Sequence, residues 1–232
     1  MIKHFSAIAL LYSLLSIYSP SSLASDNVDD ERALLAGIFP TSCHFSGQFL
    51  QQKNIQGLPV PLQSDGDFFY SCDLGLVWST KAPFQEAILY VNSAKNYRID
   101  EQGEIKPLTG IARYIMSNVF VKLLKGDVDY FADEFVVTAT ENQSIELKPE
   151  SEFMQKGVES IQFSKTQSPE LGVALMVDVI DATGQVTQVG IDEIIEHDIE
   201  GKRSAFEQCE KLYQDTTKWC SVLRSPSRFE KF

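Results

Sequence analysis

The sequence lacks the short motifs that mark the common catalytic and cofactor sites. It has no Gly-x-Ser-x-Gly turn for a serine nucleophile, no glycine-rich phosphate or dinucleotide loop, and no His-Glu-x-x-His zinc site. The chain has three histidines and four cysteines, and no two cysteines form a Cys-x-x-Cys pair of the kind that binds zinc. We therefore expect no enzymatic activity, no cofactor and no metal site.

Basic residues are scarce as well. The chain has 20 lysines and arginines against 32 aspartates and glutamates, which gives a formal net charge of -12 at pH 7. Contacts from Lys and Arg to phosphate dominate the affinity of proteins for nucleic acids, and no basic cluster is present here. The composition argues against binding to DNA or RNA, and it disfavours binding to an anionic bilayer.

Long apolar runs are absent except at the start of the chain. There, Lys3 precedes an apolar run from Ala7 to Ile17, and small residues lead up to Ala24. An apolar run of ~7 to 15 residues with a small-residue exit is typical of a Sec signal peptide, whereas a spanning helix needs ~18 or more. We expect residues 1–24 to be a signal peptide, cleaved after Ala24, rather than a membrane anchor.

The segment that remains after this cleavage, residues 25–232, has a length that suits a single domain with a sizeable core. Two domains are possible, but no linker, repeat or low-complexity stretch indicates them. Loss of Lys3 moves the formal net charge to -13. No cysteine stands directly after the cleavage site, where an N-terminal lipid anchor would be attached. We expect an exported, soluble protein that is a monomer.

The four cysteines of the mature chain suggest two disulfides, with three possible connectivities. An antiparallel register that places Cys43 opposite Cys72 also places Gly47 opposite Phe68 and Phe49 opposite Gly66. Large residues then face small ones, which favours this pairing. Cys209 and Cys220 pair by default. Continuous helix would hold their backbones ~16 Å apart, so the chain must turn between them, near residues 214–217.

Most of the chain reads as strands, with helical segments at three places. The residues around 26–39 predict a helix that ends before Pro40, and the tail from Gly201 predicts a helix followed by irregular chain. Between these lie alternating runs typical of strands, with a loop over residues 56–66 and hairpins at Gln102-Gly103 and Gly184-Gln185. The segment from Phe131 to Pro149 also reads as strand.

The segment from Leu108 to Asp127 predicts a helix that is apolar on most of its circumference. Its polar stripe, made by Arg113, Ser117 and Asn118, is narrow. Such a helix must be covered by the rest of the protein, or must itself cover something apolar. An antiparallel sheet with its helices gathered on one side, open as a partial barrel under this helix, is the economical architecture.

Neither histidine of the mature chain forms a convincing catalytic pair. His44 adjoins Cys43, but neighbours in a strand point to opposite faces, so we expect a disulfide cysteine beside a surface histidine rather than a thiolate pair. His197 is surrounded by acids, and we expect it to be a solvated residue.

Several strand motifs together resemble one known family. The stretch "FSGQFLQQK" is followed by "GDFFYSCDLGLVWSTKAPF" and then by "AILYVNSAKNYRID". The chain resembles here the periplasmic outer-membrane lipoprotein carrier (LolA-like) family, and a looser likeness continues to Glu193. None of these motifs is catalytic, and their order and spacing carry the resemblance.

This resemblance implies an α+β fold with an antiparallel, incompletely closed β-barrel (half-barrel), and helices that form a lid over a hydrophobic cavity. It implies a periplasmic carrier or chaperone that shelters a lipoprotein or other acylated lipid between an inner-membrane donor and an outer-membrane acceptor protein. The cavity and lid residues that we expect to contact the acyl chains are Phe49, Phe68, Leu76, Trp78, Ile88, Tyr90, Ile111, Ile115, Met116, Val119 and Phe120. For each aromatic residue, a place in an ordinary core is the alternative.

The sequence departs from the family at one position. The carriers have an arginine in the second strand that helps to hold the lid closed, and alignment from Gly66 to Trp78 puts Cys72, followed by Asp73, in its place. We therefore expect a divergent member with another way of closing its lid. A protein-interaction or sensory module of the envelope, or a hydrolase with its site in the cavity, are the alternative functions.

Overall fold

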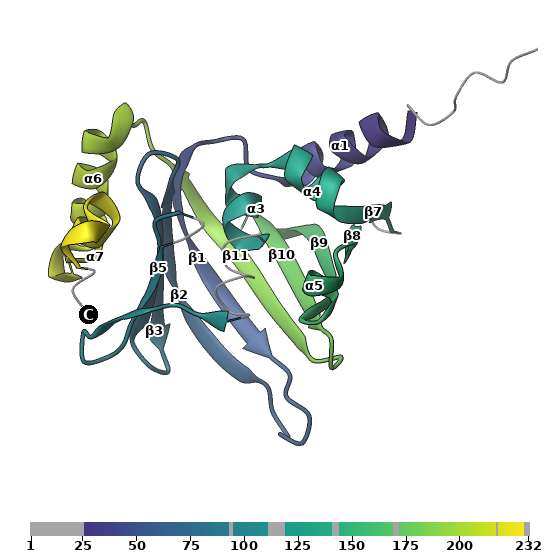
Figure 1. Ribbon diagram of the computed structural model, residues 1–232, viewed down its shortest axis with the longest axis horizontal. Helices are drawn as coiled ribbons and strands as arrows, with labels where there is room; N and C mark the ends of the chain where they lie inside the picture. Colours follow the sequence, from purple (N-terminus) through teal and green to yellow (C-terminus); the bar gives the residue numbers. More distant parts are fainter. Residues whose placement is uncertain are drawn as a thin grey trace, which may run out of the picture.

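The computed structural model describes residues 26–92, 95–110, 119–140, 144–168, 172–216 and 218–229. They form one antiparallel sheet of eleven strands in the order β6-β5-β4-β3-β2-β1-β11-β10-β9-β8-β7 (Figure 1). The strands are β1 His44–Lys53, β2 Leu62–Ser71, β3 Gly75–Ala82, β4 Glu86–Tyr90, β5 Asn96–Ile99, β6 Ile105–Pro107, β7 Phe135–Ala139, β8 Ile145–Pro149, β9 Val158–Ser168, β10 Gly172–Asp181 and β11 Val186–Glu196.

The sheet is open, because β6 and β7 are its two edges and do not pair with each other. Strands β1 to β6 form one meander and β7 to β11 another, and the pairing of β1 with β11 joins them. The hairpins expected at Gln102-Gly103 and Gly184-Gln185 connect β5 to β6 and β10 to β11. The predicted α+β class, with an antiparallel sheet that does not close into a barrel, is confirmed.

The register of β1 against β2 is the one that the alternation of large and small residues predicts. Gly47 faces Phe68, and Gly66 faces Phe49. A Cβ atom on Gly66 would lie 1.9 Å from the carbonyl oxygen of Ser79 and 2.9 Å from the Phe49 ring. Only glycine therefore lets the Phe49 ring lie across the strand at this point.

Both disulfides form as expected. Cys43 is bonded to Cys72 across β1 and β2, with 5.4 Å between the Cα atoms. Cys209 is bonded to Cys220, and the chain turns between them through a short 3-10 helix, Gln214–Thr216. Two disulfides in a chain of this size fit an oxidising compartment.

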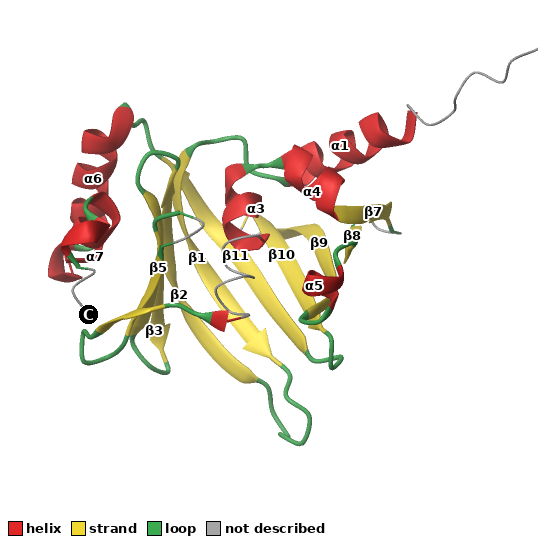
Figure 2. Cartoon of the chain, viewed as in Figure 1, coloured by secondary structure: helices red, strands yellow, loops and turns green. Residues whose placement is uncertain are grey.

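Helices cover both faces of the sheet (Figure 2). The inner face carries Phe68 and Trp78, and it packs in one cluster with α1 Asp26–Ile38, α3 Val121–Lys125, α4 Val128–Glu134 and α5 Glu152–Gln155. The outer face carries Phe69 and Val77, and it packs with α6 Gly201–Leu212 and α7 Lys218–Arg224. The expectation that all helices gather on one side was wrong.

The helices on the outer face are explained by a part of β2 in which buried residues do not alternate with exposed ones. Phe68, Phe69 and Tyr70 are consecutive and all three are buried. Since neighbouring side chains in a strand point to opposite faces, such a run makes both faces apolar, and each face needs a cover.

Three local predictions were also wrong. Residues 131–134, expected as strand, belong to helix α4, because Asp127 caps this helix by accepting a hydrogen bond from the backbone N–H of Tyr130. Strand β2 begins at Leu62, within the expected loop, because β1 extends to Lys53 and pairs with it. The tail after the turn at Gln214–Thr216, expected to be irregular, is helical as α7, because four of its residues are buried against the outer face.

Residues 111–118 of the apolar helix predicted over residues 108–127 lie outside the described residues. Residues 121–125 form α3, which ends at Gly126 in the left-handed conformation, with φ 67°. A Cβ atom at this position would lie 2.6 Å from the carbonyl oxygen of Pro40. In the described part of the chain, no helix has the length and apolar character needed to cross a bilayer.

Candidate ligand cavity

The inner face of the sheet carries a continuous group of aromatic side chains. The Trp78 ring stacks on Phe49 with 4.0 Å between centroids, and it also lies 5.7 Å from Phe68 and 5.6 Å from Phe120. Phe45 extends the group, 5.9 Å from Phe68. Offset and edge contacts of this kind add to the free energy that burial of the rings supplies. Trp78 is thus the link between the strands and the segment that leads into α3.

The structure brings together all the predicted cavity and lid residues that it describes. Six of them are buried in the inner cluster and two, Ile88 and Tyr90, are half-buried against it. These eight are Phe49, Phe68, Leu76, Trp78, Ile88, Tyr90, Val119 and Phe120. Ile111, Ile115 and Met116 lie outside the described residues.

A cavity of about 570 Å³ opens on this face, at the end of the sheet where β1 joins β2 and β3 joins β4. Trp78, Ile88 and Phe120 form its apolar floor. Its volume is within the range of pockets that bind small molecules. Of the eight predicted residues, these three line the cavity, and the other five belong to the same inner cluster.

Sequence reasoning missed the polar rim of the cavity. The rim includes Gln51, Lys53, Ser64, Thr80, Glu86, Arg98 and Asp100. Thr80 follows Trp78 by two residues and Glu86 precedes Ile88 by two, so period-two alternation places them on the same face. This alternation is the signal in the sequence that could have identified the rim.

Three charged groups of the rim, Arg98, Glu86 and Asp100, have ion-pair partners. The guanidinium of Arg98 donates to the Glu86 carboxylate, and the Lys106 ammonium lies 2.9 Å from a carboxylate oxygen of Asp100. The hydrogen bond from Lys106 is the main cause that keeps the pKa of Asp100 below its ordinary value. Exposed pairs of this kind contribute little to stability, but they keep the entrance hydrated above an apolar floor.

The segment over the inner face is held by apolar packing. Val119 and Phe120 are buried, and so are Val121, Leu123 and Leu124 in α3. Cys72, which stands where the lipoprotein carriers have an arginine, is in a disulfide. In the described residues, the contacts of this segment with the inner face are apolar.

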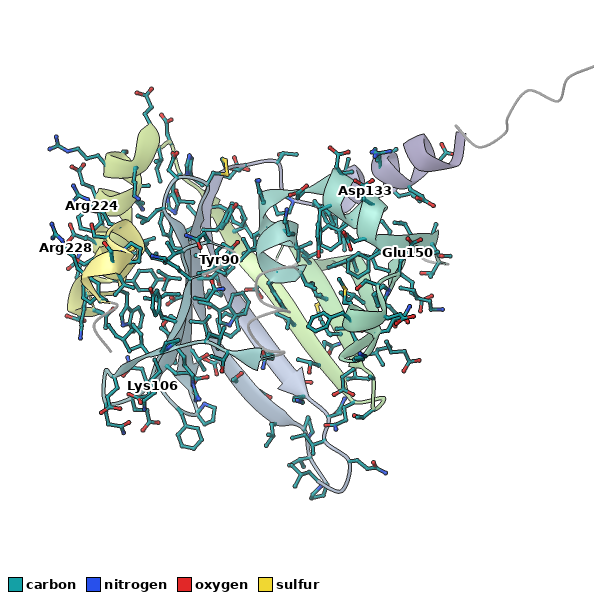
Figure 3. All side chains as sticks on the ribbon, in the orientation of Figure 1. Tyr90, Lys106, Asp133, Glu150, Arg224 and Arg228 are labelled. Carbon is teal, nitrogen blue, oxygen red and sulfur yellow. A yellow bond between two sulfur atoms is a disulfide. The ribbon has the colours of Figure 1, made fainter. Side chains whose placement is uncertain are left out.

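Two tyrosines lie beside this segment. Burial, together with the charges of Tyr90 and Asp127, raises the pKa of Tyr70 to about 12. Burial also raises the pKa of Tyr90, which Figure 3 shows near the centre of the molecule, whereas Lys106 lies at its periphery. Asp127 pairs with Lys122 at 2.6 Å. Both phenols therefore stay neutral at physiological pH and line the upper part of the inner face as amphipathic groups.

A second cavity, of about 590 Å³, lies at the other end of the aromatic group. Phe39, Phe45 and Leu175 are among its lining residues. Lys165 reaches across its border and donates a 2.6 Å hydrogen bond to the carbonyl oxygen of Gly37 in α1. The inner face therefore has free space at both ends of β1, with the packed aromatic group between.

The histidines have more specific partners than expected. His44 Nδ1 lies 3.0 Å from Ser71 Oγ, and its Nε2 lies 3.7 Å from Asp73. Ser71 is buried and accepts hydrogen bonds from the backbone N–H groups of Asp73 and Leu74. Its hydroxyl is therefore committed to the turn between β2 and β3, and the Ser-His-Asp sequence of contacts has a structural role. The thiolate pair with Cys43 is excluded by the disulfide.

His197 is half-buried, and the expectation that it is a solvated residue was wrong. Its Nε2 lies 2.9 Å from Ser46 Oγ, and its Nδ1 lies 3.3 Å from the side-chain nitrogen of Gln208 in α6. Burial, followed by the charges of Lys211 and His44, lowers its pKa.

Ser46 borders a small cavity of about 150 Å³ on the outer face, which is also lined by Asp67, Glu193 and Tyr213. Negative charge at this place opposes the oxyanion that acyl transfer would require. Within the described ranges, no three His, Cys, Asp and Glu side chains come together as a metal site would require.

No protein-family model matches the sequence, and no curated protein sequence matches it either. The solved structures that are similar to it include the following two proteins. A LolA superfamily protein from Nitrosomonas europaea is 9% identical with a TM-score of 0.42, over 75% of this chain and 94% of its own. A DUF1329 family protein from Desulfovibrio piger is 12% identical with a TM-score of 0.43, over 75% of this chain and 95% of its own. These values describe a distant likeness of fold.

Proposed function

We propose that this protein is a non-catalytic periplasmic carrier, a divergent relative of the lipoprotein carriers, that shelters an acyl chain of a lipid or lipoprotein. The lipid or lipoprotein is carried between an inner-membrane donor protein and an outer-membrane acceptor protein. The observation that supports this most directly is the 570 Å³ cavity with its floor of Trp78, Ile88 and Phe120.

The energetics favour an acyl chain as the ligand. Burial of apolar surface contributes about 25 cal/mol per Å², so an acyl chain supplies several kcal/mol without a charged contact. The polar and charged rim leaves the polar end of such a ligand in water. The two disulfides and the predicted signal peptide at residues 1–24 support an exported carrier.

Titration with a fluorescent long-chain fatty acid tests this proposal. Ile88 is half-buried and lines the cavity, so Ile88→Asp places a charge on the floor without emptying the core. We expect the substitution to weaken binding at least about tenfold, because a bound acyl chain would remove water from the carboxylate that Ile88→Asp introduces. The matched control is Val136→Asp, at a half-exposed position on the edge strand β7, far along the sheet from the cavity.

Unfolding temperatures of both variants separate loss of ligand from loss of fold. Equal binding by the wild type and Ile88→Asp, or no binding by a folded wild type, would contradict the proposal.

A further inference from the structure

Four large apolar side chains are exposed at one end of the sheet. Leu58, Val60 and Leu62 are 48%, 66% and 53% exposed, and Phe84 is 67% exposed. The first three belong to the connection of β1 to β2 and its border, and Phe84 belongs to the connection of β3 to β4. Since these strands are antiparallel neighbours, both connections lie at the same end (Figure 1). We name these four residues the tip residues.

The tip residues border the mouth of the ligand cavity. Leu62 and Phe84 are among the residues that line it, together with Trp78 of the floor. An apolar surface therefore continues from the floor of the cavity through its mouth to the outside of the molecule.

The connections that carry the tip residues have no charge. No charged side chain occurs in residues 54–64 or 83–85, although 22% of the chain is charged. Pro59, Pro61 and Pro83 fix the backbone on either side of Val60 and before Phe84. Fixed backbone prevents these side chains from folding back onto one another to leave water.

We propose that the tip residues dock this protein on the surface of a zwitterionic bilayer, with the mouth of the cavity toward the lipid. Apolar side chains on an uncharged segment enter the boundary between headgroups and acyl chains without a cost for desolvating charge. An anionic bilayer repels the acidic remainder of the chain, so charge selects the zwitterionic surface. A bilayer matches two protruding connections better than a protein partner, which would need a cavity shaped for each.

Docking is separate from the proposed carrier function. It needs the tip residues alone, whereas binding of a fatty acid in solution needs the floor of the cavity. Val60 is suited to the test because it is the most exposed of the tip residues outside the cavity lining.

Flotation of the mature protein with phosphatidylcholine vesicles tests the proposal. The wild type is compared with Val60→Asp and with the control Val136→Asp, the same substitution at an exposed valine of β7. We expect Val60→Asp to reduce the bound fraction about tenfold while Val136→Asp leaves it unchanged, because only Val60 enters the bilayer. Vesicles with an equal part of phosphatidylglycerol should bind the wild type more weakly.

Fluorescent fatty-acid binding by Val60→Asp should equal that of the wild type. A wild type that binds fatty acid but no phosphatidylcholine vesicle would overturn docking and leave the carrier function intact, with the tip residues assigned to a protein partner. A wild type that binds the vesicles but no fatty acid would support docking and overturn the carrier function. Equal flotation of Val60→Asp and the wild type would also overturn the proposal.

Discussion

Two glycines decide how the aromatic side chains of the inner face pack. A Cβ atom on Gly47 would meet the Phe68 ring at 2.8 Å, and one on Gly66 would meet the Ser79 carbonyl at 1.9 Å. Phe49 lies across Gly66 and stacks on Trp78, so the floor of the cavity depends on the absence of one side chain.

The substitution Gly66→Ala should therefore be strongly destabilising. The added methyl group meets backbone rather than the end of a flexible side chain, so the strands must separate, at a cost of more than about 2 kcal/mol. Urea unfolding followed by circular dichroism measures it. Gly37→Ala is the control, because nothing lies within 4 Å of its Cβ position in α1, and it should be neutral or slightly stabilising. Similar midpoints for both variants would refute this account of the packing.

His197 predicts a dependence of stability on pH. Burial keeps its pKa in the folded chain below the usual 6.5. As the pH falls through 6.5, the unfolded chain takes up a proton that the folded chain does not, so the free energy of unfolding decreases toward acid pH. His197→Gln should flatten this decrease between about pH 7 and 5. Urea midpoints at several pH values measure it, and an unchanged slope in the variant would count against the assignment.

Residue contacts could be predicted where one strand pair contains them. The disulfide of Cys43 with Cys72 and the positions of Gly47 and Gly66 all follow from a single register. The surroundings of His197 could not be predicted, because Ser46 is 151 residues away along the chain and is brought near by the pairing of β1 with β11.

At the scale of elements, α6 and α7 make a second layer that is independent of the ligand cavity. They pack on the outer face, against Phe69, Val77 and Leu89, and the disulfide of Cys209 with Cys220 joins them. The cavity lies on the other side of the same strands.

Loss of this disulfide should affect stability and not ligand binding. The double variant Cys209→Ser with Cys220→Ser removes a short covalent loop, which typically costs about 2 to 4 kcal/mol. Thermal unfolding should show the loss of stability. The affinity for a fluorescent fatty acid, measured below the unfolding transition, should stay within about twofold of the wild type, because the disulfide contributes no atom to the cavity. A large loss of affinity at a temperature where the variant is folded would show that the two faces are coupled.

The succession of strands along the chain could largely be predicted from the alternation of apolar and polar residues, but the helices that cover the outer face could not. The run from Phe68 to Tyr70 indicates two apolar faces, but the helices that cover one of them lie more than 130 residues later in the chain. Helix α4 was missed for a local reason, since its cap at Asp127 competes with strand-like alternation in the residues that follow.

At the scale of the whole molecule, an open sheet leaves space that a closed barrel would fill. The inner face is packed along most of β1 and has a cavity at each end, of about 570 and 590 Å³. Sequence patterns indicated the apolar face but not which part of it remains open, because that depends on the segment from Val119 to Leu124, which lies above it. Five of the predicted cavity residues pack in the inner cluster without lining the 570 Å³ cavity.

Export can be tested on the intact chain. The predicted cleavage after Ala24 gives a mature protein that begins at Ser25 and has no covalently attached lipid. Intact mass spectrometry of the protein collected from the periplasm should give the mass of residues 25–232 with two disulfides. A mass that retains residues 1–24, or one increased by acyl groups on the chain, would contradict the prediction.

Native mass spectrometry of the mature protein, purified from the periplasm of its source without detergent, tests the central claim most directly. We predict a population whose mass exceeds that of the polypeptide by that of an acylated molecule. This molecule is released on activation, and it is lost in Ile88→Asp but kept in Val136→Asp. A wild type that is folded and carries no apolar ligand, before and after incubation with long-chain fatty acid, would contradict it.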